Sequence, residues 1–215
     1  MIDRRSVLKG LVAIPIVAAA GGFATALLSY LRPTLKPLQF PTPEKPLNKD
    51  LVAGSLSEFP QPYAFKEFIF SQETVEYTSR GKQQTNVPGY IVRIPDGKVP
   101  ASVGDAGGGL RRGYAVTQYQ GQTYNMVVVS RICAHLGCIF QYHTPQEVCQ
   151  SFNYCGGKNN MFSCPCHLSV YDPTQVGYGN GVPLPGLVVS GPAPRPPFPF
   201  DFVIDGDKIV IKGYS

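Results

Sequence analysis

The chain is poor in charged residues: Asp, Glu, Lys and Arg make up only 15% of its 215 residues, whereas Gly (23) and Pro (21) are abundant. Outside residues 10–31, no segment keeps helical periodicity for more than a few turns, which argues against a helical bundle. The composition instead favours a loop-rich β protein. The sequence also lacks a Ser-His-Asp triad, a phosphate-binding loop and a catalytic acid pair, so none of the chemistries that these motifs serve is indicated.

The formal net charge of +5 comes mainly from the N-terminal part of the chain. Residues 1–50 carry seven Lys/Arg and three Asp/Glu, whereas residues 51–215 carry twelve and eleven. The larger part therefore lacks the basic stripe that contact with a phosphate backbone requires. We do not expect nucleic acid as a partner.

A charge-free run from Gly10 to Leu31 is long enough to cross a membrane. As a helix rising 1.5 Å per residue, it would cover about 33 Å, and a hydrocarbon core is ~30 Å thick. Residues 1–9, with Arg4-Arg5, resemble a twin-arginine export signal. We expect an uncleaved anchor, with a cleaved signal peptide or a buried helix as alternatives. The basic residues before the run predict a single-pass protein of a bacterial-type cytoplasmic membrane, with its head on the outer, periplasmic side.

Residues 32–50 contain five prolines and no hydrophobic periodicity, which predicts a semi-rigid linker. Beyond it, short β-branched and aromatic runs are bounded by Gly, Pro and Asp, as at residues 75–78, 90–94 and 123–133. The clearest hairpin is expected at residues 201–212, around Asp205-Gly206. The sequence predicts an all-β head over residues 51–215, folded as an antiparallel sandwich or small barrel.

All six cysteines lie between positions 133 and 166, within two short motifs and the segment that joins them. The motifs are C-A-H-L-G-C at 133–138 and C-P-C-H-L-S at 164–169. Each offers a Cys-His pair that can reach one metal centre from a loop: Cys133 with His135, and Cys164 with His167. Thiolates and imidazoles together are compatible with a tetrahedral zinc or with an iron–sulfur cluster.

Cys138 and Cys166 are left over if those four residues are ligands. Their matched positions suggest a disulfide that joins the two loops over the metal. Such a bridge would close a loop of 29 residues and contribute roughly 3–4 kcal/mol in the chain-entropy model. It requires an oxidising compartment, in agreement with the export signal.

The two motifs resemble those of the Rieske iron–sulfur family, with Ala134 in place of Thr and Leu168 in place of Gly. The resemblance implies a Rieske-like fold behind one N-terminal transmembrane helix, with a cluster-binding subdomain at about residues 130–195. It also implies one 2Fe-2S cluster, with Cys133 and Cys164 on one iron and His135 and His167 on the other. The Cys138–Cys166 disulfide is part of the same pattern.

Further residues take their expected roles from this resemblance. Ser169 and Tyr171 match positions that donate hydroxyl hydrogen bonds to cluster sulfurs, which raises the reduction potential. Leu136 matches the tip residue that shields the histidines and contacts quinone. Residues 191–194, G-P-A-P, resemble the proline loop that covers the cluster, with a plain surface turn as the alternative.

The sequence also departs from the family. The 25 residues between Cys138 and Cys164 form a longer segment than expected and contain Cys149 and Cys155. We expect a second disulfide there, with a free thiol pair or an extra metal site as alternatives. His143 is interpreted as a polar loop residue. Leu168 puts a tight turn in doubt and suggests altered packing below the cluster.

As a function, the resemblance implies the redox subunit of a quinol–cytochrome c oxidoreductase. Its head would take an electron and a proton from quinol, with His135 and His167 at the reacting surface, and pass the electron to a c-type cytochrome beside cytochrome b. One alternative is the Rieske small subunit of an exported molybdenum oxidoreductase such as an arsenite oxidase. Another is an exported structural zinc domain without electron transfer.

Overall fold

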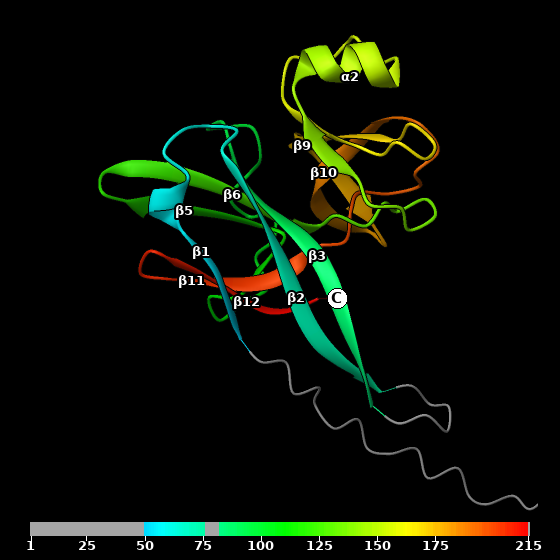
Figure 1. Ribbon diagram of the computed structural model, residues 1–215. Coiled ribbons are helices and arrows are strands. Elements are labelled where there is room, and N and C mark those ends of the chain that lie inside the picture. The colour runs from blue at the N-terminus through cyan, green and yellow to red at the C-terminus, as the bar shows by residue number, and fades with distance from the viewer. Residues whose placement is uncertain (1–49, 76–81, 215) are drawn as a thin grey trace, which may run out of the picture. The chain divides into compact units, whose positions relative to one another are not determined.

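The computed structural model describes residues 50–75 and 82–214 (Figure 1). The expected signal (1–9), the anchor (10–31) and the linker up to residue 49 lie outside these residues. Within the part that is described, no helix has the length and apolar character needed to cross a membrane.

Antiparallel strands arranged in three four-stranded sheets make up most of the described chain, which confirms the predicted all-β class. The terminal sheet has the order β1 (Leu51–Ser55), β12 (Lys208–Tyr214), β11 (Phe200–Asp205), β4 (Arg111–Arg112). The central sheet has the order β2 (Phe65–Val75), β3 (Lys82–Ile94), β6 (Gln122–Ser130), β5 (Tyr114–Tyr119). The loop-bearing sheet has the order β10 (Val182–Ser190), β9 (Val170–Gly179), β8 (Met161–Ser163), β7 (Gln141–His143). A 3₁₀ turn, η1 (Leu56–Glu58), follows β1.

The expected C-terminal hairpin is present as β11 and β12. Asp205 pairs with Lys208, so the connection consists of two residues. Gly206 begins it at φ 61°, a left-handed conformation that glycine adopts at little cost. The hairpin prediction is therefore confirmed.

Strand β6 of the central sheet is buried on both of its faces. Along β6, Met126 and Val128 belong to one core, whereas Val127 and Val129 belong to another. Because successive side chains of a strand point to opposite faces, this alternation makes β6 a wall between two cores. The fold therefore agrees with the predicted antiparallel β head, and its strands form three sheets around these two cores.

The two cores have different neighbours. The first contains side chains of the terminal sheet, among them Phe200, Phe202, Ile209 and Ile211. The second contains Cys133 and Cys164 of the two motifs, Phe162 and Tyr171 of the loop-bearing sheet, and Phe140, which precedes β7. The cysteines that were predicted as ligands are therefore part of a hydrophobic core that rests on the central sheet.

One helix, α2 (Pro145–Phe152), lies in the segment between the two motifs and was not predicted (Figure 1). Thr144 caps it, since its hydroxyl accepts a hydrogen bond from the Glu147 amide. With Pro145 at the first position, T-P-Q-E is a capping box that marks a helix start. Val148 and Phe152 bury one face, which stabilises a helix too short to form alone.

Candidate metal centre

The first motif forms a six-residue turn between β6 and β7. The Cys133 amide donates a hydrogen bond to the Cys138 carbonyl at 2.7 Å, and the Gly137 amide donates to the Cys133 carbonyl at 3.0 Å. Gly137 has φ 80°, a left-handed value that suits glycine. The residues on either side of the turn, Ile132 and Ile139, form an antiparallel bridge that closes it.

The second motif repeats this turn between β8 and β9. The Cys164 amide donates to the Ser169 carbonyl at 2.8 Å, and the Leu168 amide donates to the Cys164 carbonyl at 3.0 Å. Leu168 takes the place of Gly137 and has φ 59°. The tight turn that the replacement of glycine put in doubt is therefore present, with a leucine in left-handed conformation.

The four predicted ligands come from these two turns. Cys133 and Cys164 are free thiols, 3% and 1% exposed. Burial is the main factor that raises the pKa of the Cys164 thiol, and the neighbouring Cys133 contributes to it. The rings of His135 and His167 lie side by side, with centroids 4.7 Å apart and an angle of 87° between their planes. The structure thus brings together two buried sulfur donors and a pair of adjacent imidazoles.

A buried nitrogen in this site lacks a partner. Among the described residues, His135 Nδ1 is buried and makes no hydrogen bond. Buried polar atoms are normally paired, so a buried imidazole nitrogen without a partner is compatible with a metal ligand. The donor set of two thiols and two imidazoles therefore fits an iron–sulfur cluster of Rieske type.

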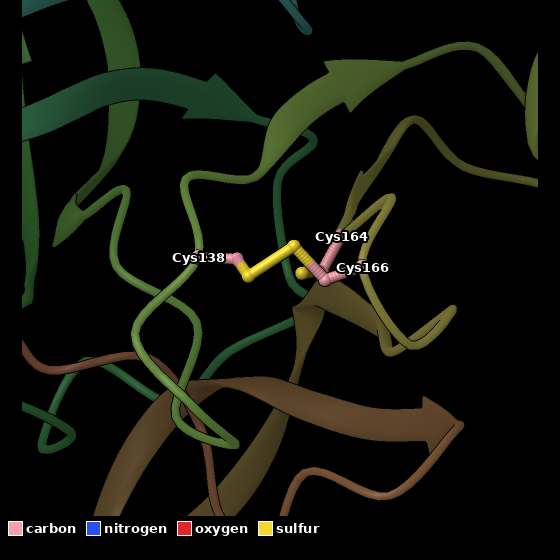
Figure 2. Close-up of side chains that lie close together, drawn as sticks. All are labelled: Cys138, Cys164 and Cys166. Carbon is pink, nitrogen blue, oxygen red and sulfur yellow. A yellow bond between two sulfur atoms is a disulfide. The ribbon is translucent and has the colours of Figure 1, made fainter.

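A disulfide between Cys138 and Cys166 joins the two turns, as predicted, and is called here the interloop disulfide. Its Cα atoms are 6.5 Å apart. Figure 2 shows the Cys164 sulfur beside this bridge, and the three sulfurs lie within 4.8 Å of one another. They do not form a metal site of their own, because two of them are bonded to each other. The bridge instead fixes one turn against the other next to a predicted ligand.

Tyr171 lies next to a predicted ligand. Its hydroxyl oxygen is 3.1 Å from the sulfur of Cys133 and accepts a hydrogen bond from the Ala134 amide at 3.2 Å. That leaves the hydroxyl proton available for the sulfur. Burial, followed by the contact with Cys133, raises the pKa of Tyr171, so the side chain remains a protonated donor.

Ser169 has a partner that sequence reasoning did not find. Its buried hydroxyl accepts a hydrogen bond from the Ala193 amide at 3.2 Å. Gly191, at φ 84°, approaches so closely that a Cβ atom there would lie 2.5 Å from the Ser169 Cα atom and 2.6 Å from the Leu168 carbonyl oxygen. Residues 191–194 are therefore seated on the second turn and are not a free surface turn.

Three apolar residues that lie within four positions of a histidine have exposed side chains. Leu136 is 69% exposed, Ile139 45% and Leu168 38%. The histidines differ, since His167 is exposed and His135 is partly buried. The side chain of Leu168 is thus partly exposed, and the exposed Ile139, which directly follows the first motif, was not singled out from the sequence.

The segment between the motifs carries its own disulfide, Cys149–Cys155, called here the helix-end disulfide. It connects α2 to the residues that follow it, which confirms the expected pairing. His143 lies beside this helix, with Nδ1 3.7 Å from a carboxylate oxygen of Glu147 and its ring 5.2 Å from that of Phe152. His143 is the last residue of β7, so the expected loop position is wrong, and its printed neighbours are not among the predicted ligands.

Two disulfide-linked Cys/His turns on an antiparallel β fold are the arrangement that the resemblance to the Rieske family implied. No protein-family model matches the chain. The chain is 34% identical over 102 residues to the chloroplast cytochrome b6-f complex iron-sulfur subunit of Bigelowiella natans, covering 47% of this chain and 31% of that protein. It is 30% identical over 87 residues to cytochrome b6-f complex iron-sulfur subunit 1 of Nostoc sp. (strain PCC 7120), covering 40% and 35%. The corresponding subunit of Chlorobaculum thiosulfatiphilum is 31% identical over 87 residues, with the same coverage.

These matches span about a third of the length of each relative. Over 40–47% of its length, the chain is similar to these iron-sulfur subunits of cytochrome b6-f complexes.

Proposed function

We propose that this chain is the electron-transfer subunit of a cytochrome bc-type complex, which takes an electron and a proton from quinol and passes the electron to a c-type cytochrome. The observation that carries the proposal is the pair of adjacent imidazoles of His135 and His167, flanked by buried thiols and by exposed apolar side chains. The names of the relatives support it, since all three are iron-sulfur subunits of cytochrome b6-f complexes.

Cys133, His135, Cys164 and His167 would hold one 2Fe-2S cluster. When bound, such a cluster supplies reversible one-electron chemistry. The Nδ1 atom of His135 is buried and has no hydrogen-bond partner among the described residues, so it is available to bind iron. The burial of both cysteines keeps water from the sulfurs, and the Tyr171 hydroxyl supplies a hydrogen bond to one of them.

The histidines face a different environment from the cysteines. His167 is exposed, so a ring nitrogen is accessible to a substrate hydroxyl. Imidazole exchanges a proton near neutral pH more readily than other side chains, which suits a ligand that receives a proton together with an electron. Leu136, 69% exposed, offers the apolar surface that the ring of a quinol can contact.

In this proposal, residues 10–31 anchor the chain in the cytoplasmic membrane, and the head lies on its outer side beside cytochrome b and a c-type cytochrome. The interloop disulfide supports an oxidising compartment for the head, because such bonds are rare in the cytosol. The proline-rich linker would then separate the head from the membrane.

The proposal is tested by isolating the complex from membranes of cells that make the full chain. We expect a cytochrome b and a c-type cytochrome to co-purify. Quinol should produce an electron paramagnetic resonance signal with an average g value below that of the free electron, and a His167→Ser variant should lose it. A signal that appears with a strong chemical reductant but not with quinol would refute the quinol reaction, and no signal with either reductant would favour a zinc site. Co-purification with a molybdenum subunit would favour the alternative oxidoreductase.

Proton coupling has a separate test. Because reduction places negative charge beside the histidines, it should favour their protonated forms, so the reduction potential should fall as the pH rises. A potential that stays constant between about pH 6 and pH 11 would rule out a proton-coupled role.

A further inference from the structure

The two six-residue turns allow an internal comparison at one backbone position. Both turns are closed by the same pair of backbone hydrogen bonds. At the left-handed position the first turn has Gly137, with φ 80°, and the second has Leu168, with φ 59°. A Cβ atom added at Gly137 would meet no described atom within 4 Å. The turn itself therefore needs no side chain at this position.

Leucine at position 168 is unfavourable to the isolated head in two respects. A left-handed backbone strains any residue with a Cβ atom, least so Asn and Asp. The side chain is also 38% exposed, so part of its apolar surface remains in water. Glycine at the same position would avoid both costs. A strained, exposed apolar residue next to predicted ligands indicates a contact that the isolated head does not make.

The position of Leu168 in the site identifies that contact. It follows His167 directly, as Gly137 follows Leu136 in the first turn. The interloop disulfide and the adjacent histidine rings hold the two turns together. Each turn therefore has an exposed apolar side chain, Leu136 in the first turn and Leu168 in the second.

We propose that Leu168 is a quinol-contact residue, whose side chain extends the apolar surface beside His167 to the second turn. The inference rests on the proposed function, because quinol is the apolar substrate that this function brings to the histidines. It goes beyond that function in assigning substrate affinity to a position where the related motif has glycine.

The size of the effect follows from the exposed fraction of the side chain. Complete burial of a leucine changes a binding constant by roughly one to two powers of ten. Because 38% of Leu168 remains to be covered, its loss should raise the KM for quinol about three- to sevenfold. The kcat should change less than twofold, since a contact made equally in the bound substrate and the transition state affects KM alone.

The experiment uses the intact complex with Leu168→Asn, Leu168→Gly and Leu168→Met. Asn tolerates the left-handed backbone but is polar, whereas Met remains apolar, so the Asn and Gly variants should raise KM and the Met variant should not. The cluster's reduction potential should be the same in all three. Val52→Asn removes another exposed apolar side chain, 58% exposed and located on β1, and should leave KM unchanged.

An unchanged KM in the Asn and Gly variants would overturn the inference while leaving the proposed function intact. A lowered thermal midpoint with unchanged KM would assign Leu168 to packing within the head, which also overturns it. If quinol fails to reduce the cluster of the unmodified complex, the proposed function fails, and this inference fails with it.

Discussion

Tyr171→Phe should lower the reduction potential of the loaded head. The Tyr171 hydroxyl lies 3.1 Å from the Cys133 sulfur, is completely buried, and already accepts a hydrogen bond from the Ala134 amide. Its proton is therefore directed to a sulfur that becomes more negative on reduction. A donor in this position stabilises the reduced form more than the oxidised form, so its removal shifts the equilibrium toward the oxidised form.

The magnitude can be estimated from the single hydrogen bond. A hydrogen bond to a charged group contributes about 1.5–3 kcal/mol, and only the part gained on reduction affects the potential. If that part is roughly a third to a half, it amounts to about 0.5–1.5 kcal/mol. At about 59 mV for each tenfold change in a one-electron equilibrium, the potential should fall by about 20–65 mV.

The assay is a spectroscopic redox titration of the full-length protein, with Tyr142→Phe as a matched control. Tyr142 contributes a phenol ring to the same core, and among the described residues its buried hydroxyl has no hydrogen-bond partner. Tyr142→Phe should therefore leave the potential unchanged, and its free energy of unfolding should not decrease. An equal fall in both variants, or no fall in Tyr171→Phe, would refute the assignment of the effect to this hydrogen bond.

Three further predictions concern stability and are checked by chemical unfolding. Gly191→Ala should lower the free energy of unfolding by more than about 2 kcal/mol, because its Cβ atom would lie 2.5 Å from a backbone atom. Gly181→Ala is also at positive φ but has no described atom within 4 Å, so it should lower this free energy by only ~1 kcal/mol. Equal losses in the two variants would contradict the close packing at Gly191. Replacing the cysteines of the interloop disulfide with serines should lower the free energy of unfolding by about 3.6 kcal/mol, and the same change at the helix-end disulfide by about 2.4 kcal/mol. The sequence separations of 28 and 6 residues imply this order, because the longer loop loses more entropy when it is closed. The reverse order would show that loop entropy does not determine the two contributions. Burial raises the pKa of Tyr114 to about 12, so the folded chain keeps a proton that the unfolded chain loses above about pH 10. The contribution of the protonated tyrosine to stability is therefore present below about pH 10 and is lost as the pH rises toward about 12. Tyr114→Phe should lose less stability at alkaline pH than the unmodified chain.

The parts of the site that the sequence predicted are local in the chain. Cys133 and His135 are two residues apart, and Cys164 and His167 are three apart, so a short loop determines whether each pair can approach one centre. The same holds for the hairpin at Gly206, where the turn chemistry is contained in a few residues. The start of α2 was equally local, and its capping box at Thr144 could have been recognised.

The parts that the sequence did not predict depend on contacts between distant segments. Ser169 accepts a hydrogen bond from Ala193, 24 positions away, and the close approach of Gly191 to the second turn appears only once both are folded. Similarly, the run M-V-V-V in β6 indicates a buried strand but not that its two faces belong to separate cores. Such relationships depend on which strands become neighbours.

The repeated turn also bears on how a cofactor can enter the protein. Each turn is closed by backbone hydrogen bonds that involve no metal, and the interloop disulfide and the seat of Gly191 are equally independent of one. In a zinc finger, the loops are ordered mainly by the metal, and the free energy of metal binding is also the free energy of folding. In this chain, backbone hydrogen bonds, a disulfide and the close packing of Gly191 also order the two turns, so less of the order would depend on a cofactor held by the predicted ligands.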